Sequence, residues 1–261
     1  MPDSIPIGLV LLLVAGIILL SIESGYRIAS YRIRKSEKER EVPIDSMLGP
    51  TLGLLAFMLA FTFGMATSRY DARRQLVVDE ANAIRTAGLR AQLLPEPQRS
   101  AIRKLLLEYV DTRLQGVLHP SDLAQAIHRS EQLHETLWSR LASLGPEVAP
   151  PDRTAFAGAL VDVINLHVKR LNAITNNRIP RAVWVGLYTL AVLSMGMLGY
   201  RAGMSGRKSS VAILALALAF SAVLVLITDL DRPLQGLVKV SQGTMMDLQS
   251  KLQEATSDKA P

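Results

Sequence analysis

Three arginines between residues 69 and 74 are the side chains in this sequence best suited to act on an ion. Arg69, Arg73 and Arg74 directly follow an uncharged apolar stretch at residues 47–67. If several copies of the chain surround an axis, symmetry repeats each guanidinium group, and the resulting ring concentrates anions at the mouth of a pore. The alternative role is ion pairing together with anchoring at the lipid headgroups.

Two stripes of side chains recur every four residues in the uncharged stretch. A ring of bulky apolar side chains forms a constriction that gates by dewetting, and the bulky stripe contains Leu55, Leu59 and Phe63. Small residues at this spacing let helix backbones approach closely in lipid, and the small stripe contains Ala56, Ala60, Gly64 and Ser68. We predict that the bulky stripe lines a pore and that the small stripe packs against a neighbouring helix. Ordinary packing within one subunit is the alternative for both.

Two carboxylates, Asp229 and Asp231, come directly before Arg232 and Pro233. Ca²⁺ prefers six or more oxygen ligands, which two carboxylates do not supply. The sequence therefore favours a salt bridge of Arg232 and a turn defined by Pro233 over a metal site.

The histidines do not show the spacing of a metal site. No His-x-x-x-His pair occurs, and surface or packing roles are favoured for His119, His128, His134 and His167. The sequence also lacks a Gly-x-Ser-x-Gly motif, a P-loop, a dinucleotide fingerprint and a zincin motif. We therefore expect no enzymatic activity, no cofactor and no metal.

The elements that carry these residues are predicted to be helices, four of which cross a membrane. Apolar residues gather in four blocks, at 5–22, 47–67, 182–200 and 211–228. About 20 apolar residues match the thickness of the hydrocarbon core. No run alternates with a period of two for long enough to indicate a strand. We predict an all-α integral membrane protein with four transmembrane helices and an α-helical soluble bundle between the second and third.

The predicted organisation has four parts. They are a transmembrane hairpin at 5–67, a helical soluble region at 68–181, a second hairpin at 182–228 and an amphipathic C-terminal tail at 229–261. One long helix is expected to run from the second span into the soluble region, over residues 46–94, because helical spacing continues past the apolar stretch. The net charge of +6 and the absence of a nucleic-acid-binding signature make a lipid bilayer, rather than nucleic acid, the expected partner.

Basic residues in the short loops indicate how the chain is oriented in the membrane. After the first and third spans come Arg27, Arg32, Arg34, Lys35, Lys38, Arg40, Arg201, Arg207 and Lys208. The positive-inside rule places these loops in the cytoplasm, and the soluble region of a bacterial inner-membrane protein would then lie in the periplasm. Each loop begins with the tripeptide Gly-Tyr-Arg, at 25–27 and at 199–201, in which Tyr and Arg are typical anchors of helix ends.

Three motifs carry a resemblance to a known family. LLAFMLAFTFGMATSRYDARRQLVVDEANAI at 54–84, RIPRAVW at 178–184 and DLDRPLQGLVKVS at 229–241 resemble the bacterial bestrophin-like domain family, and the likeness covers almost the whole chain. Bestrophins, which are more distant, are pentameric anion channels with four membrane helices per subunit and a cytoplasmic helical region. The resemblance therefore implies a homo-oligomer that passes small anions such as chloride, with the soluble region cytoplasmic.

The chain departs from the bestrophin pattern in two places. The bulky stripe is followed by Tyr70 and Asp71, as in a bestrophin neck, but the pair is offset by one residue, and Ala72 and Arg73 replace an aromatic pair. The acidic calcium clasp after the fourth span has too few oxygen ligands here, so the resemblance does not extend to calcium gating.

Two functions from different classes remain at this point. The first is a homo-oligomeric anion channel, a pentamer by the resemblance to bestrophins, whose pore is lined by the second span. The second is a non-conducting, membrane-anchored helical sensor or scaffold that binds another protein. The number of subunits in a mild detergent discriminates between them, because only the channel needs a ring.

Overall fold

The computed structural model of the protein describes residues 5–35, 44–205, 210–234 and 236–257. Lys38, Arg40, Arg207 and Lys208, which enter the orientation prediction, lie outside the described residues. The described residues form helices and no strand, and four of these helices are long and apolar enough to cross a membrane. The predicted all-α fold with four membrane helices is confirmed.

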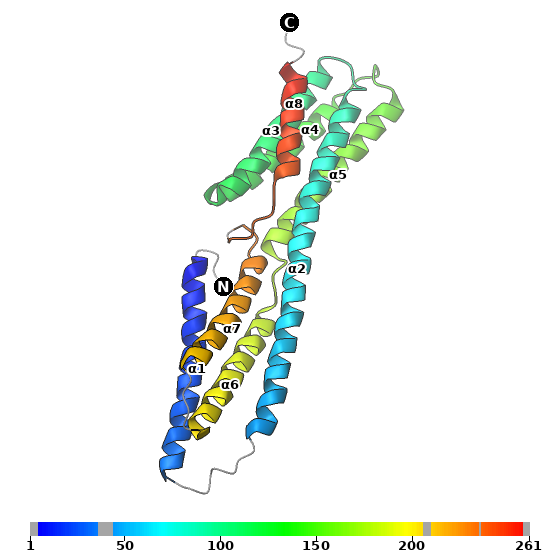
Figure 1. Cartoon of the computed structure of the whole chain (residues 1–261). Coiled ribbons are helices and arrows are strands. Elements are labelled where there is room, and N and C mark those ends of the chain that lie inside the picture. The colour runs from blue at the N-terminus through cyan, green and yellow to red at the C-terminus, as the bar shows by residue number, and fades with distance from the viewer. Residues whose placement is uncertain (1–4, 36–43, 206–209, 235, 258–261) are drawn as a thin grey trace. The chain divides into compact units, whose positions relative to one another are not determined.

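The helices follow one another along the chain as labelled in Figure 1. Their bounds are α1 Ile7–Lys35, α2 Ile44–Ala91, α3 Gln98–Leu118, the short 3₁₀ helix η2 Pro120–Asp122, α4 Leu123–Ala142, α5 Pro150–Thr175, α6 Arg181–Ser205, α7 Ser210–Asp231 and α8 Gly243–Ser257. The predicted long helix is present as α2, which ends three residues before Leu94.

The chain divides into two compact units, and the boundary falls inside α2. The membrane unit contains Met1–Tyr70 and Arg178–Lys239, and the helical unit contains Asp71–Asn177 and Val240–Pro261. The segment predicted as a C-terminal tail at 229–261 is therefore divided, because its part from Val240 onward, with α8, belongs to the helical unit.

Glycines join α1 and α6 in the membrane unit, where the two helices lie side by side (Figure 1). A Cβ atom added to Gly25 would lie 2.8 Å from the backbone nitrogen of Tyr200, and one added to Gly199 would lie 2.7 Å from the carbonyl carbon of Ile22. Real Cβ atoms do not approach backbone so closely, so only glycine permits this helix spacing. The glycines of both Gly-Tyr-Arg tripeptides therefore hold one helix pair together.

The core of the membrane unit draws on all four spans, but it covers only a minority of their surface. Its most deeply buried side chains include Val10, Ile18, Leu55, Leu187, Met195 and Leu224. At most 28% of the residues in the apolar window of any span are buried. Lipid or further copies of the chain must therefore cover the remaining apolar surface.

The helical unit has a core of the kind found in a water-soluble bundle. It includes Ile84 of α2, Leu106 of α3, Leu137 of α4, Leu160 of α5 and Leu248 of α8. Figure 1 shows α8 beside α3, and the two helices are in contact. Burial of these side chains from water supplies the main favourable free energy of this unit.

Candidate functional site

The bulky stripe of α2 faces the interior of its own subunit. Leu55 is 0% exposed and Leu59 is 6% exposed, and both belong to the core of the membrane unit. Side chains covered by their own subunit cannot also line a pore on its outside. Leu55 and Leu59 thus pack inside their own subunit, whereas Phe63 is 38% exposed and stays available on the outer surface.

The small stripe lies on the opposite, uncovered face of α2. Ala56, Ala60, Gly64 and Ser68 are all exposed. A Cβ atom added to Gly53 or Gly64 would meet nothing within 4 Å. The predicted packing of this stripe does not occur within the described part of one subunit, and the stripe remains available for contact with another copy.

Aromatic side chains accompany the small stripe on this face. Phe57 is 65% exposed and Phe61 is 55% exposed. The uncovered face of α2, by which we mean Gly53, Ala56, Phe57, Ala60, Phe61, Phe63, Gly64 and Ser68, thus alternates small and large apolar residues. This composition suits close contact between helices in a membrane.

The three predicted pore-mouth arginines have different surroundings. Arg69 is half-buried and helps to line a surface hollow of about 420 Å³ together with Phe61, Gly64, Met65 and Ser68. Its Nη1 atom has no hydrogen-bond partner among the described residues. Arg74 is exposed, but Arg73 is only 4% exposed, so Arg73 is not available to an ion outside its own subunit.

The carboxylates at the C-terminal end of α7 accept hydrogen bonds from backbone N–H groups. The Asp229 carboxylate is buried and accepts hydrogen bonds from the backbone N–H groups of Leu237 and Val238, at distances between 2.9 and 3.1 Å. Asp231 accepts a hydrogen bond from the backbone N–H of Ile179 at 3.0 Å. Among the described residues, no group of three His, Cys, Asp or Glu side chains could hold a metal ion.

Arg232 and Gly236 complete this turn. Arg232 donates to the backbone oxygen of Ile5 at 2.8 Å, where the sequence predicted a salt bridge with a carboxylate. Gly236 has a φ of +144°, a conformation that favours glycine. The segment after α7 is therefore a turn held by hydrogen bonds between side chains and backbone, and Pro233 lies within it.

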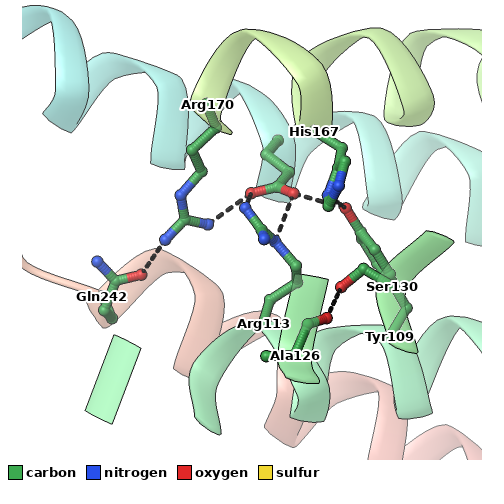
Figure 2. Close-up of polar contacts among 8 residues, drawn as sticks. Tyr109, Arg113, Ala126, Ser130, His167, Arg170 and Gln242 are labelled. Carbon is green, nitrogen blue, oxygen red and sulfur yellow. Dashed lines mark hydrogen bonds and ion pairs between the residues drawn. The ribbon is translucent and has the colours of Figure 1, made fainter. Parts of the chain in front are cut away.

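The helical unit contains a buried charge cluster that the sequence analysis did not identify. The Glu80 carboxylate, which is 0% exposed, pairs with Arg113 at 2.9 Å and with Arg170 at 2.5 Å. Figure 2 shows Arg113 and Arg170 reaching one carboxylate from different helices, with Gln242 beside Arg170. The cluster therefore links α2, α3, α5 and the segment before α8 through one buried anion.

Tyr109 and two histidines extend this cluster. Tyr109 donates to Glu80 at 2.7 Å, and its oxygen lies 3.3 Å from Nδ1 of His167 (Figure 2). Because the single phenol proton goes to Glu80, His167 contacts the phenol as the Nδ1–H donor. The His134 ring lies 4.9 Å from the rings of both Tyr109 and His167, measured between centroids.

The cluster holds its side chains in fixed ionisation states. Burial raises the pKa of Glu80, but the charges of Arg113 and Arg170 outweigh it and bring this pKa to about 2. Burial and, after it, the charge of Arg113 lower the pKa of His134 from 6.5 to about 4. The same two causes, with His134 third, lower the pKa of His167 to about 3. At neutral pH, Glu80 is thus ionised and both histidines are uncharged.

A sequence signal for the cluster exists. Glu80 lies on the same helical face as Val77 and Ile84, which are 2% and 0% exposed. A carboxylate in an apolar stripe is rarely buried without a partner, so this position predicts a buried cation from another helix. The sequence does not indicate which arginines supply it, because Arg113 and Arg170 are distant along the chain.

Comparisons with known proteins agree with this architecture. A family profile described as the Bestrophin-like domain matches residues 27–245. A variant of a bacterial bestrophin homologue from Klebsiella pneumoniae superimposes with a TM-score of 0.68 at 15% identity, covering 96% of this chain and 98% of that one. Another crystal structure of that homologue gives a TM-score of 0.66 at 15% identity, with 98% and 100% of the two chains covered. The sequence matches none of the curated proteins compared with it.

Proposed function

This chain belongs to the bestrophin-like domain family, and on that premise we propose that it forms a homo-oligomeric anion channel in the bacterial inner membrane. In this proposal the uncovered face of α2 contacts neighbouring copies and lines the pore. Chloride is the simplest anion to test. The proposal keeps α2 as the pore helix but assigns the lining to Ala56, Ala60 and Phe63 rather than to Leu55 and Leu59, and it leaves Gly53 and Gly64 to contact the neighbouring copy.

The observation that carries the proposal is the exposure of small residues on a membrane helix. Glycine costs helix stability relative to alanine, by about 1 kcal/mol per residue. Gly53 and Gly64 gain no close packing within the subunit in return, since nothing lies within 4 Å of a Cβ added to either. In lipid, the benefit of such residues is close approach to another helix. A second copy of α2 supplies that helix.

The side chains beyond the apolar part of α2 favour anions over cations. Arg69 is half-buried and lines, together with Ser68, the hollow beside the apolar part of α2. Arg74 adds an exposed positive charge further along α2. Repeated around an axis, such guanidinium groups raise the local concentration of anions.

Two measurements on purified protein test the proposal. Light scattering in a mild detergent gives the number of subunits, and liposomes with a chloride gradient report the flux. Ala60→Trp is expected to lower chloride flux at least tenfold, because indole rings then fill the space around the axis. Val185→Trp on α6 is the matched control, since Val185 is also exposed, at 66%, on a membrane helix.

The outcomes separate the channel from the alternative function. Several subunits with a chloride flux that Ala60→Trp blocks and Val185→Trp leaves unchanged support the channel. A single subunit, or liposomes that stay tight with correctly folded wild-type protein, contradict it and favour a non-conducting sensor or scaffold. Arg74→Glu is expected to reduce chloride flux more weakly, because it reverses one charge without narrowing the pore.

A further inference from the structure

The outer surface of α4 in the helical unit carries a tryptophan beside two carboxylates. Glu131, Glu135 and Trp138 are spaced at i, i+4 and i+7, so they lie on one face of the helix. Both carboxylates are exposed, and Trp138 is 46% exposed. Neither carboxylate forms an ion pair with a residue that the structure describes. We call these three residues the acidic patch. Tryptophan is enriched among the residues that dominate binding in protein interfaces.

The exposed side of α2 in the same unit has the opposite charge. Arg85, Leu89 and Leu93 follow one another every four residues and share a helical face. Arg85 is exposed, and the two leucines are 58% and 57% exposed. Within the described part of the chain, Arg85 has no ion pair either. In this basic patch, apolar side chains follow a cation, whereas in the acidic patch an aromatic side chain follows two anions.

Contacts with α3 give the level of the basic patch in the bundle. Arg113 of α3 pairs with Glu80 of α2. Further along α2, a Cβ atom added to Gly88 would lie 3.9 Å from the side chain of Leu106. The two helices are therefore antiparallel. Arg85, which lies between Glu80 and Gly88, is level with the part of α3 between their two partners.

Contacts on the other side of α3 give the level of the acidic patch. A Cβ atom added to Gly116 would lie 2.7 Å from the Cβ atom of Ala126 on α4. The ring of Tyr109 lies 4.9 Å from the ring of His134, measured between centroids. Hence α4 is antiparallel to α3 and runs in the same direction as α2. Glu135 directly follows His134, so it lies beside the same part of α3 as the basic patch.

The order and spacing of the two patches match. Counted through α3, Arg85 is level with Glu135 to within about one helical turn. Leu89 comes four residues after Arg85, and Trp138 comes three residues after Glu135, so these two are level as well. Copies related by a rotation axis along these helices stay at the same height, and a head-to-tail contact between two different patches closes into a ring.

On the premise that the chain forms the proposed homo-oligomer, we propose that the basic patch of one copy docks on the acidic patch of the next. Arg85 pairs with Glu135 of the neighbouring copy, and Leu89 packs on Trp138 of that copy. Charge complementarity favours a second copy as the partner, because one chain carries both patches, in the same order and at the same level. Complementary charges of this kind fix the register between partners.

Disulfide cross-linking of the full-length protein in a mild detergent tests this contact, since the chain has no cysteine. On oxidation, the double variant Leu89→Cys, Trp138→Cys should give a ladder of covalent species from the dimer to the full ring, because every chain has one thiol on each patch. Each single variant should remain monomeric on a denaturing gel, because position 89 meets position 138 and not another position 89. Arg85→Cys with Glu135→Cys is a second pair that keeps Trp138.

The matched control is the double variant Leu89→Cys, Lys104→Cys. Lys104 is exposed on α3, two residues from Leu106 and thus near the level of Leu89, but it lies outside both patches. This variant should cross-link far less than the patch pair. Equal cross-linking of the two double variants would overturn the proposal, because it would show collision rather than docking.

Charge reversal tests the ion pair. In the Leu89→Cys, Trp138→Cys protein, Arg85→Glu should slow cross-linking severalfold through repulsion between like charges, and the addition of Glu135→Arg should restore the rate. Light scattering on the wild type separates the possible failures. Several subunits without a ladder, or covalent dimers from a single-cysteine variant, would overturn the contact alone. A single subunit would overturn the homo-oligomer as well.

Discussion

The two halves of α2 differ in which residues depart from the simple pattern of apolar side chains inside and polar ones outside. In the membrane unit, α2 buries the leucines Leu55 and Leu59 and leaves alanine and glycine outside. In the helical unit, the same helix buries a carboxylate, Glu80, and leaves the apolar side chain of Leu89 58% exposed. Polarity alone therefore does not identify the inner face of the membrane half, and in the helical half one carboxylate interrupts an otherwise apolar inner face.

The difference follows from the surroundings of each half. Lipid tails are as apolar as leucine, so a membrane helix gains little from hiding leucine and packs by shape instead. In water, the hydrophobic effect covers apolar side chains, and a buried charge persists only when it is paired and hydrogen-bonded. Exposed glycine in the first half and a paired carboxylate in the second thus show most clearly how the packing of the two halves differs.

The largest effect is expected from removing the buried charge in the second half. Glu80→Gln leaves Arg113 and Arg170 buried without their anion, and should lower the free energy of unfolding by about 3–5 kcal/mol. Glu108→Gln is the control, because Glu108 pairs with Arg129 at the surface, where both side chains are more than 40% exposed. Its cost should be about 0–1 kcal/mol. Thermal unfolding in detergent measures both, and equal effects would contradict the role given to the cluster.

Acidification should weaken the same cluster more gradually. The pKa values of His134 and His167 lie below 6.5 in the folded chain, so the unfolded chain binds more protons as the pH falls below about 6.5. Stability should decrease between about pH 6.5 and 4, and below pH 4.5 Glu80 contributes in the same direction. The expected loss for His134 alone is roughly 2–3 kcal/mol.

Unfolding temperatures measured across this pH range test the prediction. The variant His134→Phe should show a flatter pH dependence than the wild type, because it removes one of the groups that titrate. Glu108→Gln again serves as the control. An unchanged pH dependence in His134→Phe would show that acid acts elsewhere.

Replacing glycines of the membrane unit by alanine should change the free energy of unfolding less. The change should differ between glycines that are covered within the subunit and glycines that are not. Gly199→Ala forces its new Cβ against the backbone of Ile22, and should cost about 1–3 kcal/mol. Gly53→Ala meets nothing in its own subunit, and should be neutral or stabilising by up to about 1 kcal/mol. Unfolding in detergent under conditions that keep single subunits compares them directly. A larger loss in Gly53→Ala would mean that α2 packs within its subunit after all.

Much of the fold could be predicted from the sequence, because the length and apolar content of each stretch are enough to identify the membrane helices. Four uncharged stretches predict four spans, and proline at 95 and 97 predicts an end near Leu94, although α2 stops at Ala91. The face of α2 was harder to predict. Leu55 and Ala56 are neighbours in one apolar stretch, and hydropathy cannot rank two faces that are both apolar.

The sequence also could not predict which residues contact each buried group. The repeated Gly-Tyr-Arg tripeptide is visible, but only the structure shows that Gly25 and Gly199 join α1 to α6. Glu80 stands out in an apolar stripe, yet its link to Arg113 and Arg170 depends on how three helices pack. The sequence favoured a salt bridge of Arg232 at the end of α7, but it did not show that Asp229 accepts hydrogen bonds from the backbone N–H groups of Leu237 and Val238.

The central claim is that the uncovered face of α2 borders a water-filled pore, and cysteine accessibility tests it most directly. The chain has no cysteine, so the wild-type protein serves as the negative control for the thiol reagent. In chloride-loaded liposomes, Ala60→Cys should react with a charged, water-soluble methanethiosulfonate, and the reaction should block chloride flux. Leu55→Cys, buried in the subunit, should not react. An Ala60→Cys protein that folds but neither reacts nor loses flux would contradict the claim.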